Sequence, residues 1–383
     1  MPGLLDLKTE AFGIDISDFS VKIAKLKIRG REFDLACFGE EPIPPGLVDN
    51  GDIKDEVALA KIINQSLAKA KGEKIRTKEV IFSLPDERAF LRIIQLPKMT
   101  PEELRKAVPF EAENHIPIPI KESYLDFEAV EPLVDHLDHC DVLLGAVPQK
   151  LVDSYIRTLK MAGLNPFAVD IESLSISRAL VKNWISTRSI LLIDFGATRT
   201  VLIIFSGRTI RFVNSVSFSS EELTKAIALE LKISRDEAKR IQMNYGLEAK
   251  TKVQLQEKTG DFELEREILD DHRVLKALAP FLEQLTAEIK KFLDFCYSHA
   301  SHEHLPLARQ EVTQVLLSGG GANLKGLDKY LARELGVSVT FGNPWVNILP
   351  EPQSRVPEEY LRRSLAYANV LGLALRGMIT DQD

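Results

Sequence analysis

ILLIDFGATRTVLIIFSGRTIRFVNSVSF, residues 190–218, is the most informative stretch of this chain. It opens on an apolar run typical of a strand covered on both faces, and two further strands are predicted over Val201–Phe205 and Thr209–Phe218. Asp194 falls where the first strand ends. The turn after it is built from small and hydroxyl-bearing residues: Gly196, Ala197, Thr198 and Thr200. A carboxylate beside such a turn suits a metal-bound phosphate, because backbone N–H groups approach the anion while the carboxylate faces the metal.

The N-terminal region repeats this pattern. Residues 12–37 read FGIDISDFSVKIAKLKIRGREFDLAC, with Asp15 at the tip of a short apolar strand and Ser17 and Ser20 in the turn that follows. A second strand is predicted over Val21–Ile28, and a glycine turn leads into a third. Such a duplication predicts two similar lobes whose acid-tipped hairpins face one another across a cleft. The alternative is two unrelated hairpins, in which the aspartates serve turn geometry alone.

A third element contains three consecutive glycines. The predicted strand Val315–Leu317 runs into SGGGANLKGL, residues 318–327, and then into a helix predicted over Leu327–Leu335. Consecutive glycines carry a large conformational entropy cost, so they indicate that the backbone must pass very close to something flat or charged. A strand, a glycine turn and a helix N-terminus together suit contact with a nucleotide. The spacing matches neither the dinucleotide-binding fingerprint nor a P-loop.

Composition excludes several classes of protein. The chain has 383 residues, long enough for two or more domains, and 56 acidic against 49 basic residues, a net charge of −7. An acidic balance argues against general nucleic-acid binding, which requires a basic face. No apolar run approaches the length of a bilayer span. Three scattered cysteines are typical of reduced thiols, which predicts a cytoplasmic protein.

The three elements, in this order, resemble the phosphate-1, phosphate-2 and adenosine motifs of the actin and sugar-kinase superfamily. Within it, the chain resembles the PilM type IV pilus assembly protein family, which is related to the division protein FtsA. The stretches that carry this resemblance are Phe12–Lys22, VDIES at 169–173, LIDFGATRT at 192–200, LLSGGGANLKG at 316–326, NPWVNI at 343–348 and LGLALRG at 371–377. They extend over nearly the whole chain.

The resemblance implies an α/β, actin-like ATPase fold: two lobes, each with a mixed sheet flanked by helices, plus an inserted α/β subdomain of the type called 1C. The implied first-lobe core is 1–84 and 162–186, with 85–161 as the inserted subdomain. The implied second-lobe core is 187–230 and 302–349, with 231–301 as its upper subdomain. The last segment, 350–383, is expected to supply a helix that packs back on the first lobe. A membrane-bound amphipathic helix, as in FtsA, is the alternative for this segment.

The resemblance also implies an ATP and Mg²⁺ site. Asp15 and Asp194 are the predicted Mg²⁺-organising carboxylates, and Asp170 and Glu172 are candidates for contact with the metal or the attacking water. The implied nucleotide-binding residues are Ser17, Ser20, Lys22, Gly196, Ala197, Thr198, Thr200, Glu237, Gln242, Gly319, Gly320, Gly321 and Asn323. Structural alternatives stay open: turn hydroxyls often bind their own backbone, and Lys22 is also placed to pair with a nearby acid. Ser17 stands where relatives usually have glycine, which predicts at most slow ATPase activity.

The implied function is that of a cytoplasmic, ATP-binding adaptor, peripheral to the inner membrane. It would bind the cytoplasmic N-terminal tail of a PilN-like membrane protein in a nucleotide-sensitive groove between the first-lobe core and the inserted subdomain. The apolar surface of Leu104–Ile120 is the predicted groove lining. Contacts with other pilus platform or motor proteins and self-association are left open. Two alternatives remain: a sugar or metabolite kinase, for which Asp170 is the candidate base, and an FtsA-like filament-forming ATPase.

Overall fold

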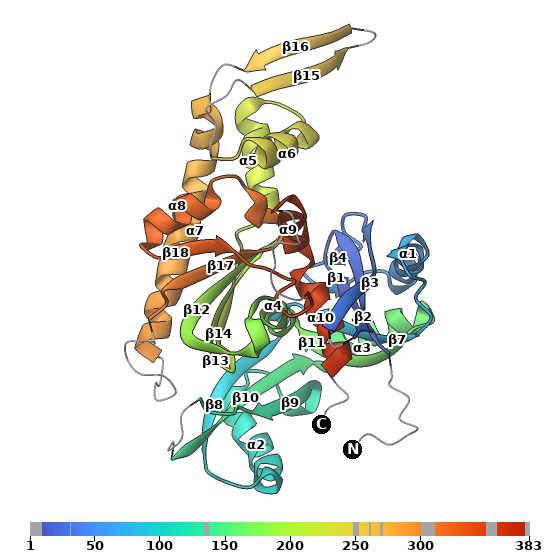
Figure 1. Cartoon of the computed structure of the whole chain (residues 1–383), viewed down its shortest axis with the longest axis vertical. Helices are drawn as coiled ribbons and strands as arrows, with labels where there is room; N and C mark the ends of the chain where they lie inside the picture. The colour runs from blue at the N-terminus through green and yellow to red at the C-terminus, as the bar shows by residue number, and fades with distance from the viewer. Residues whose placement is uncertain are drawn as a thin grey trace.

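The computed structural model describes residues 10–30, 32–133, 138–247, 253–259, 262–268, 271–299, 311–349 and 358–379. Two α/β lobes lie side by side, a small inserted unit lies below them, and a helical extension rises above the second lobe (Figure 1). Parts of the predicted segments 302–349 and 350–383, namely 302–310, 350–357 and 380–383, lie outside the described residues. The predicted α/β, two-lobed fold is confirmed.

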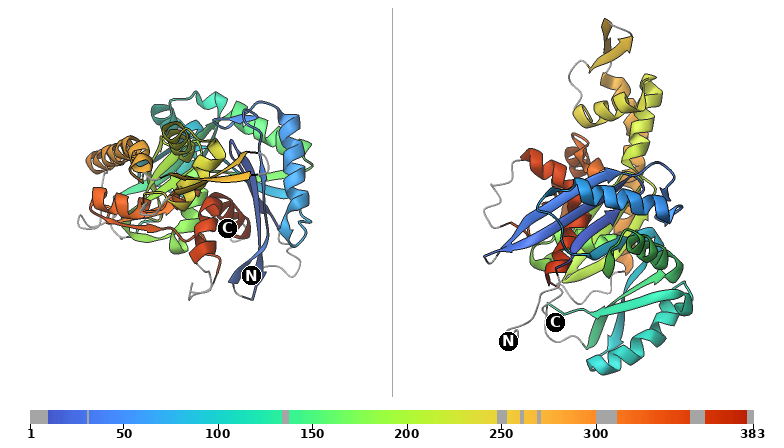
Figure 2. Two further views of the ribbon diagram at one scale, coloured as in Figure 1. Left: turned by 90° about the horizontal axis from the view of Figure 1, so that it is seen from above. Right: turned by 90° about the vertical axis from the view of Figure 1, so that its right-hand side faces the viewer.

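The first lobe is built on a six-stranded sheet in the order β11-β7-β1-β2-β3-β6. Its strands are β1 (Phe12–Ile16), β2 (Ser20–Arg29), β3 (Glu32–Pro42), β6 (Lys71–Gly72), β7 (Glu79–Leu84) and β11 (Asn165–Ile171). Helices α1 (Glu56–Lys69) and α3 (Gln149–Met161) cover one face, and α10 (Ala368–Ile379) covers the other (Figure 2). The predicted boundary at residue 161 assigns α3 to the inserted subdomain, but its apolar side chains pack in the first-lobe core.

The second lobe repeats this topology with five strands in the order β14-β13-β12-β17-β18. They are β12 (Ser186–Phe195), β13 (Thr200–Gly207), β14 (Thr209–Val216), β17 (Gln314–Ser318) and β18 (Ser338–Phe341). Helices α7 (Asp271–His299) and α8 (Leu327–Leu335) pack on one face and α4 (Glu172–Leu180) on the other. In both lobes the acid-tipped strand pairs antiparallel with the strand that follows it and parallel with a later one.

Helices α4 and α10 cross between the lobes, and a glycine makes the crossing possible. A Cβ atom at Gly372 of α10 would lie only 1.8 Å from the carbonyl oxygen of Ser175 on α4. The loop after β18 fastens the end of α4, because Asn347 Nδ2 donates to the carbonyl oxygens of Arg178 (2.9 Å) and Val181 (2.8 Å). These carbonyls lie at a helix C-terminus, where intrahelical donors are missing. The NPWVNI and LGLALRG stretches therefore hold the lobes together.

The inserted unit consists of β8 (Phe90–Pro97), α2 (Pro101–His115), β9 (Ser123–Ala129) and β10 (His139–Pro148), with the sheet order β8-β10-β9. Thr100 and Glu103 form a capping box at the start of α2. The prediction that the apolar surface of Leu104–Ile120 lines a groove is wrong for the apolar face of α2. Its Leu104, Val108 and Ala112 are buried in the core of the inserted unit, because this three-stranded sheet has one helix to cover it.

The helical extension consists of α5 (Ser220–Leu231), α6 (Arg235–Asn244), the upper part of α7 and the hairpin β15 (Val253–Thr259)–β16 (Phe262–Ile268), as Figure 1 shows. The C-terminal segment forms α9 (Glu358–Ser364), a 3-10 turn (Leu365–Tyr367) and α10. The apolar side of α10, including Val370, Leu371 and Leu375, is buried against β2 and its neighbours. This side of the helix is therefore inside the protein.

The helix crossing predicts that alanine substitution of two glycines of α10 changes the stability by different amounts. Gly372→Ala should lower the free energy of unfolding by about 1–3 kcal/mol or more, because the added methyl overlaps the α4 backbone. Gly377→Ala is the matched control, since the nearest atom to its Cβ would lie 3.2 Å away and alanine favours helix. Urea denaturation measures both. Equal effects of the two substitutions would contradict the close crossing.

Candidate functional site

Asp15 is the next-to-last residue of β1, and its side chain is buried between the lobes. The residue is 5% exposed, and its Oδ1 accepts a 3.0 Å hydrogen bond from Asn369 Nδ2 of α10. Lys22 Nζ lies 3.8 Å from its other oxygen. Burial raises the pKa of Asp15 to about 6, although Lys22 opposes the shift. Keeping the Asp15 carboxylate ionised in the folded protein therefore costs free energy.

Asp194 occupies the equivalent place on β12. Its Oδ1 accepts a 2.6 Å hydrogen bond from Ser318 Oγ, at the end of the parallel neighbour β17. Burial, with smaller contributions from the negative charges of Glu172 and Asp15, raises its pKa to about 6, although the Ser318 hydrogen bond opposes the shift. The two strand tips are therefore close enough for one carboxylate to act on the other. The structure brings the two predicted metal residues together.

Glu172 and Asp86 complete what we call the acidic cluster: Asp15, Asp86, Glu172 and Asp194. Glu172 is the first residue of α4, and its charge raises the pKa of the other three carboxyls. Asp86 accepts a 3.0 Å hydrogen bond from the Ser173 N–H, and burial raises its pKa to about 8. Sequence reasoning missed Asp86. Its position just after β7, which pairs parallel with β1, would have placed it at the same sheet edge.

Arg199 and Lys22 are the cations next to this cluster among the described residues. Arg199 lies in the turn between β12 and β13, and its guanidinium contacts Glu172 (3.2 Å) and Glu87 (2.8 Å). Burial lowers the pKa of Arg199, but Glu172 and Glu87 raise it more, so the guanidinium stays charged. Sequence reasoning also missed Arg199, Ser318 and Asn369. A lone asparagine in the apolar pattern of α10 was the available signal for the last of these.

The predicted phosphate turns use most of their hydroxyls internally. Ser17 and Ser20 close a tight turn: the Ser17 N–H donates to the Ser20 carbonyl at 3.0 Å, and the Ser20 N–H donates to Ser17 Oγ at 3.1 Å. Lys22 Nζ donates to Ser20 Oγ at 3.1 Å. In the second turn, Thr200 Oγ1 is buried and donates to the Phe218 carbonyl at 2.7 Å. The turn hydroxyls thus stabilise the shape of the loops beside the two aspartates.

Close backbone approach explains two of the three consecutive glycines. Gly319 has φ of +83°, and a Cβ there would lie 2.4 Å from the Phe195 carbonyl oxygen. A Cβ at Gly321 would lie 2.8 Å from the Phe195 ring and carbonyl. The group that the loop approaches is therefore the end of β12. Gly320 is exposed, and Asn323 Nδ2 fastens the loop by donating to the carbonyls of Gly320 (3.3 Å) and Arg362 (3.1 Å).

The turn that contains Gly196 and Ala197 also depends on a close approach of the backbone. The Gly196 N–H donates to the Arg199 carbonyl at 2.9 Å, and a Cβ at Gly196 would lie 2.8 Å from that oxygen. Ala197 is exposed and Thr198 is half-buried at the tip of the turn. The tip therefore carries the small side chains that the sequence indicates.

Three predicted site residues lie in other networks. Glu237 forms the capping box of α6 with Ser234, and Gln242 is buried and donates to the Ser220 carbonyl at 3.2 Å. Asp170 is 3% exposed and pairs with Arg178 (2.6 Å) and Arg376 (3.2 Å). Its carboxylate therefore bridges β11, α4 and α10 outside the acidic cluster.

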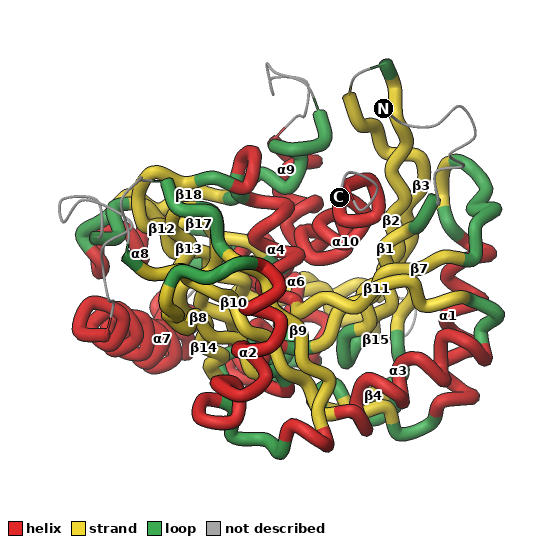
Figure 3. Tube along the Cα trace, turned by 90° about the horizontal axis from the view of Figure 1, so that it is seen from below, coloured by secondary structure: helices red, strands yellow, loops and turns green. Residues whose placement is uncertain are grey.

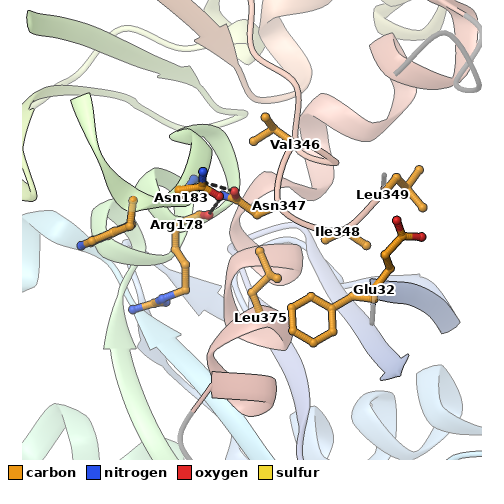
Figure 4. A pocket seen from close by; sticks show the side chains of 10 residues that line it. Glu32, Arg178, Asn183, Val346, Asn347, Ile348, Leu349 and Leu375 are labelled. Atoms are coloured by element: carbon orange, nitrogen blue, oxygen red, sulfur yellow. Dashed lines mark hydrogen bonds between the residues drawn. The ribbon is translucent and has the colours of Figure 1, made fainter. Parts of the chain in front are cut away.

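A cavity of about 500 Å³ lies elsewhere between the lobes (Figure 4). Its lining comes from β3, the end of α4, the following 3-10 turn η3 (Lys182–Trp184), the loop after β18 and α10: Glu32, Phe33, Arg178, Asn183, Trp184, Val346, Asn347, Ile348, Leu349 and Leu375. None of the residues predicted for nucleotide or metal binding lines it. Within the described residues, no three His, Cys, Asp or Glu side chains are grouped to hold a metal ion.

The duplicated topology defines an actin-like ATPase fold, and solved structures agree. MreB 5 of Spiroplasma citri bound to AMPPNP is similar at 13% identity over 98% of each chain, with a TM-score of 0.58. The ethanolamine utilization protein EutJ from Carboxydothermus hydrogenoformans is similar at 13% identity over 95% of this chain and 88% of that chain, with a TM-score of 0.51. Among the described residues, no helix has the length and apolar character to cross a membrane.

The family follows from a sequence match. The model of the type IV pilus assembly protein PilM matches residues 13–258, so the chain belongs to this family. The model of the cell division protein FtsA matches residues 191–372. A chain of a solved PilM–PilN type IV pilus biogenesis complex is similar at 29% identity over 97% of this chain and 99% of that chain, with a TM-score of 0.76. The predicted family is confirmed.

The buried carboxyl of Asp86 predicts a pH-dependent stability difference. Because its pKa is raised in the folded state, its stabilising effect is complete below its unfolded pKa near 4 and is lost as the pH rises to about 8. Asp86→Asn should therefore become more stable than the wild type by up to about 1.4 kcal/mol per pH unit over this window. Thermal unfolding from pH 4 to 8.5 measures the difference.

The control for this prediction is Asp294→Asn, which changes an exposed carboxylate on α7. This substitution tests whether the loss of any carboxylate gives the same pH profile. An Asp86→Asn difference that stays constant with pH, or that Asp294→Asn reproduces, would contradict the burial of the Asp86 carboxyl in the cluster.

Proposed function

We propose that this chain is an adaptor of the type IV pilus assembly platform that binds Mg-ATP at the acidic cluster. The observation that carries the proposal is the meeting of Asp15 and Asp194, two strand-tip carboxylates far apart in the sequence, between the lobes. Their raised pKa values mean that a divalent cation would relieve the cost of ionising them. Family membership and the likeness to a chain of a PilM–PilN complex support the pilus assignment.

Mg²⁺ suits the donor set. It prefers oxygen ligands, keeps several waters and is commonly held by one or two carboxylates plus substrate phosphates. Asp15 and Asp194 would hold it in this way, since the described residues contain no compact group of three ligands. When bound, the ion neutralises phosphate charge and bridges phosphate oxygens. Lys22 and the backbone N–H groups at Ala197 and Thr198 would contact the phosphates.

The nucleoside end of ATP would lie toward the second lobe. Gly320 is exposed in the glycine loop that packs on the end of β12, so it leaves a small surface for a flat ring. Asn323 holds that loop. Glu237 and Gln242 are the α6 residues that we assign to the wall of the adenosine site, with the similarity to MreB 5 bound to AMPPNP as support.

Glu172 is the better candidate than Asp170 for orienting an attacking water. Glu172 belongs to the acidic cluster and pairs with one arginine, Arg199, whereas two arginines pair with Asp170. The same arginines weaken the kinase alternative, which needs a free catalytic base at Asp170. Ser17, whose hydroxyl and N–H are both used in the first turn, favours slow hydrolysis at most.

The PilN-like tail would bind at the outer edge of β11. This strand is at the end of the first-lobe sheet, and Phe167 (45% exposed) and Val169 (37% exposed) lie on it. Its C-terminal end adjoins the inserted unit, because a Cβ at Gly145 of β10 would contact the Ile171 side chain at 3.9 Å. In the view from below, β9 of the inserted unit and β11 of the first lobe appear in the same region (Figure 3). Edge strands accept extended peptides by added strand pairing, and exposed apolar side chains give such peptides specificity.

Such an adaptor would work in the cytoplasm and reach the inner membrane through its PilN-like partner. Other platform or motor proteins and further copies of the chain would meet surfaces away from β11. Exposed Leu229 on α5 and Met243 on α6 mark one surface in the helical extension.

Magnesium and nucleotide affinity tests the first half of the proposal. Asp15→Asn and Asp194→Asn should each lower the affinity for Mg-ATP by about tenfold or more in calorimetric titration, because each removes a charge that faces the metal. Both variants should lose the Mg²⁺ dependence of binding. Asp294→Asn on the surface should bind as the wild type does. Unchanged affinity in both cluster variants would refute the assignment.

Peptide binding tests the second half. Phe167→Asp should abolish retention on an immobilised PilN-like N-terminal tail, because it places a charge in the apolar edge. Phe110→Asp is the matched control, since Phe110 is 75% exposed on α2 of the inserted unit. The reverse result, with binding lost only in Phe110→Asp, would show that the peptide binds at α2 and not at β11.

A further inference from the structure

One side chain of the second lobe reaches two parts of the first. Arg199, in the turn that we assign to phosphate binding, contacts Glu172 at the start of α4 and Glu87 in the 3-10 turn η1 (Asp86–Arg88). Its side chain is only 11% exposed, whereas Glu172 is 13% and Glu87 29% exposed, so the Glu87 pair is the more accessible of the two. Removing one partner of a shielded pair is costly, because it leaves the other charge uncompensated.

Glu87 is at the root of the inserted unit. It lies between β7, which belongs to the first-lobe sheet, and β8, which opens the inserted sheet. A movement of Glu87 therefore changes the direction in which β8 leaves the first lobe. Ser215 Oγ of β14 also lies 3.5 Å from the Glu87 carboxylate, so the root touches the second lobe twice.

The inserted unit also rests on the second lobe. Asp141 of β10 pairs with Arg211 of β14, and Glu131 lies 3.6 Å from Arg208 in the β13–β14 turn. Strand β8 lies along β14. The unit is thus covalently joined to the first lobe and ionically joined to the second. Its position must change if the lobes turn relative to one another.

A terminal phosphate next to the Gly196–Thr200 turn would compete for Arg199. Guanidinium groups bind phosphate oxygens with two parallel hydrogen bonds, and this geometry favours phosphate over a single carboxylate oxygen. Glu87 contributes one oxygen to the present pair. A diphosphate would leave this pair in place, because it lacks the additional charged group.

We propose that Arg199 is the residue through which a terminal phosphate sets the position of the inserted unit, by exchanging Glu87 for that phosphate. The proposal rests on the function given above and extends it to regulation. With a triphosphate bound, Glu87 is released and the root of β8 loosens from the second lobe. With a diphosphate, Arg199 keeps its contact with Glu87 and holds the start of β8 against the second lobe. The peptide-binding edge of β11, next to the inserted unit, therefore takes two forms.

Hydrogen–deuterium exchange of the full chain with Mg-ATPγS and with Mg-ADP tests this exchange of partners. In the wild type, amides in η1, β8 and β14 should exchange faster with the triphosphate than with the diphosphate. Glu87→Gln should remove this difference, and it should raise the affinity for the triphosphate several-fold without changing that for the diphosphate. Arg199→Gln should lower the triphosphate affinity by about tenfold and leave the diphosphate affinity unchanged.

Glu131→Gln is the control, because it breaks another contact of the inserted unit with the second lobe and leaves Arg199 intact. Because this pair is exposed, the substitution should change exchange little in either nucleotide state and preserve the difference between them. If the wild type binds both nucleotides but shows no difference, or if Glu87→Gln keeps it, the proposal is overturned. If the wild type binds neither nucleotide, the proposed function itself fails, and the two failures are distinguishable.

Discussion

The candidate site depends on four carboxylates that lie near one another between two lobes, with Asp15 and Asp86 buried and Asp194 and Glu172 partly exposed. Burial raises the pKa of Asp15, Asp86 and Asp194, and Glu172 adds its own charge to each of them. Lys22 and Arg199 offset only part of this charge. The proposed function follows from this excess of negative charge, because a magnesium-bound phosphate would supply the missing cation.

Two repeated sheets create this meeting. In each lobe the acid-tipped strand lies between an antiparallel neighbour and a parallel one, so its tip lies at the edge where the parallel strand also ends. Gly372 then lets α4 and α10 cross closely enough to bring the two sheets together. Asn369 of α10 donates to Asp15, which joins this crossing to the cluster. The helices that assemble the lobes thus also position the candidate site.

The sequence predicted the fold and the two strand-tip aspartates because strand periodicity, turn residues and duplication are local signals. It did not predict Asp86 and Arg199, because their importance comes from parallel pairing and from contacts between lobes. The apolar face of α2 was interpreted as a groove, although periodicity alone does not distinguish a binding face from a core face. The triple glycine was correctly interpreted as a close approach, but Phe195 is the group that it approaches in the described structure.

The most direct test is a crystal structure with Mn²⁺ in place of Mg²⁺ and a non-hydrolysable ATP analogue, with the metal located by its anomalous signal. We expect one metal peak between Asp15 and Asp194, in contact with phosphate oxygens and reached by the carboxylates directly or through water. A metal or nucleotide bound at the cavity lined by Phe33 and Trp184, with Asp15 and Asp194 unchanged, would contradict this interpretation.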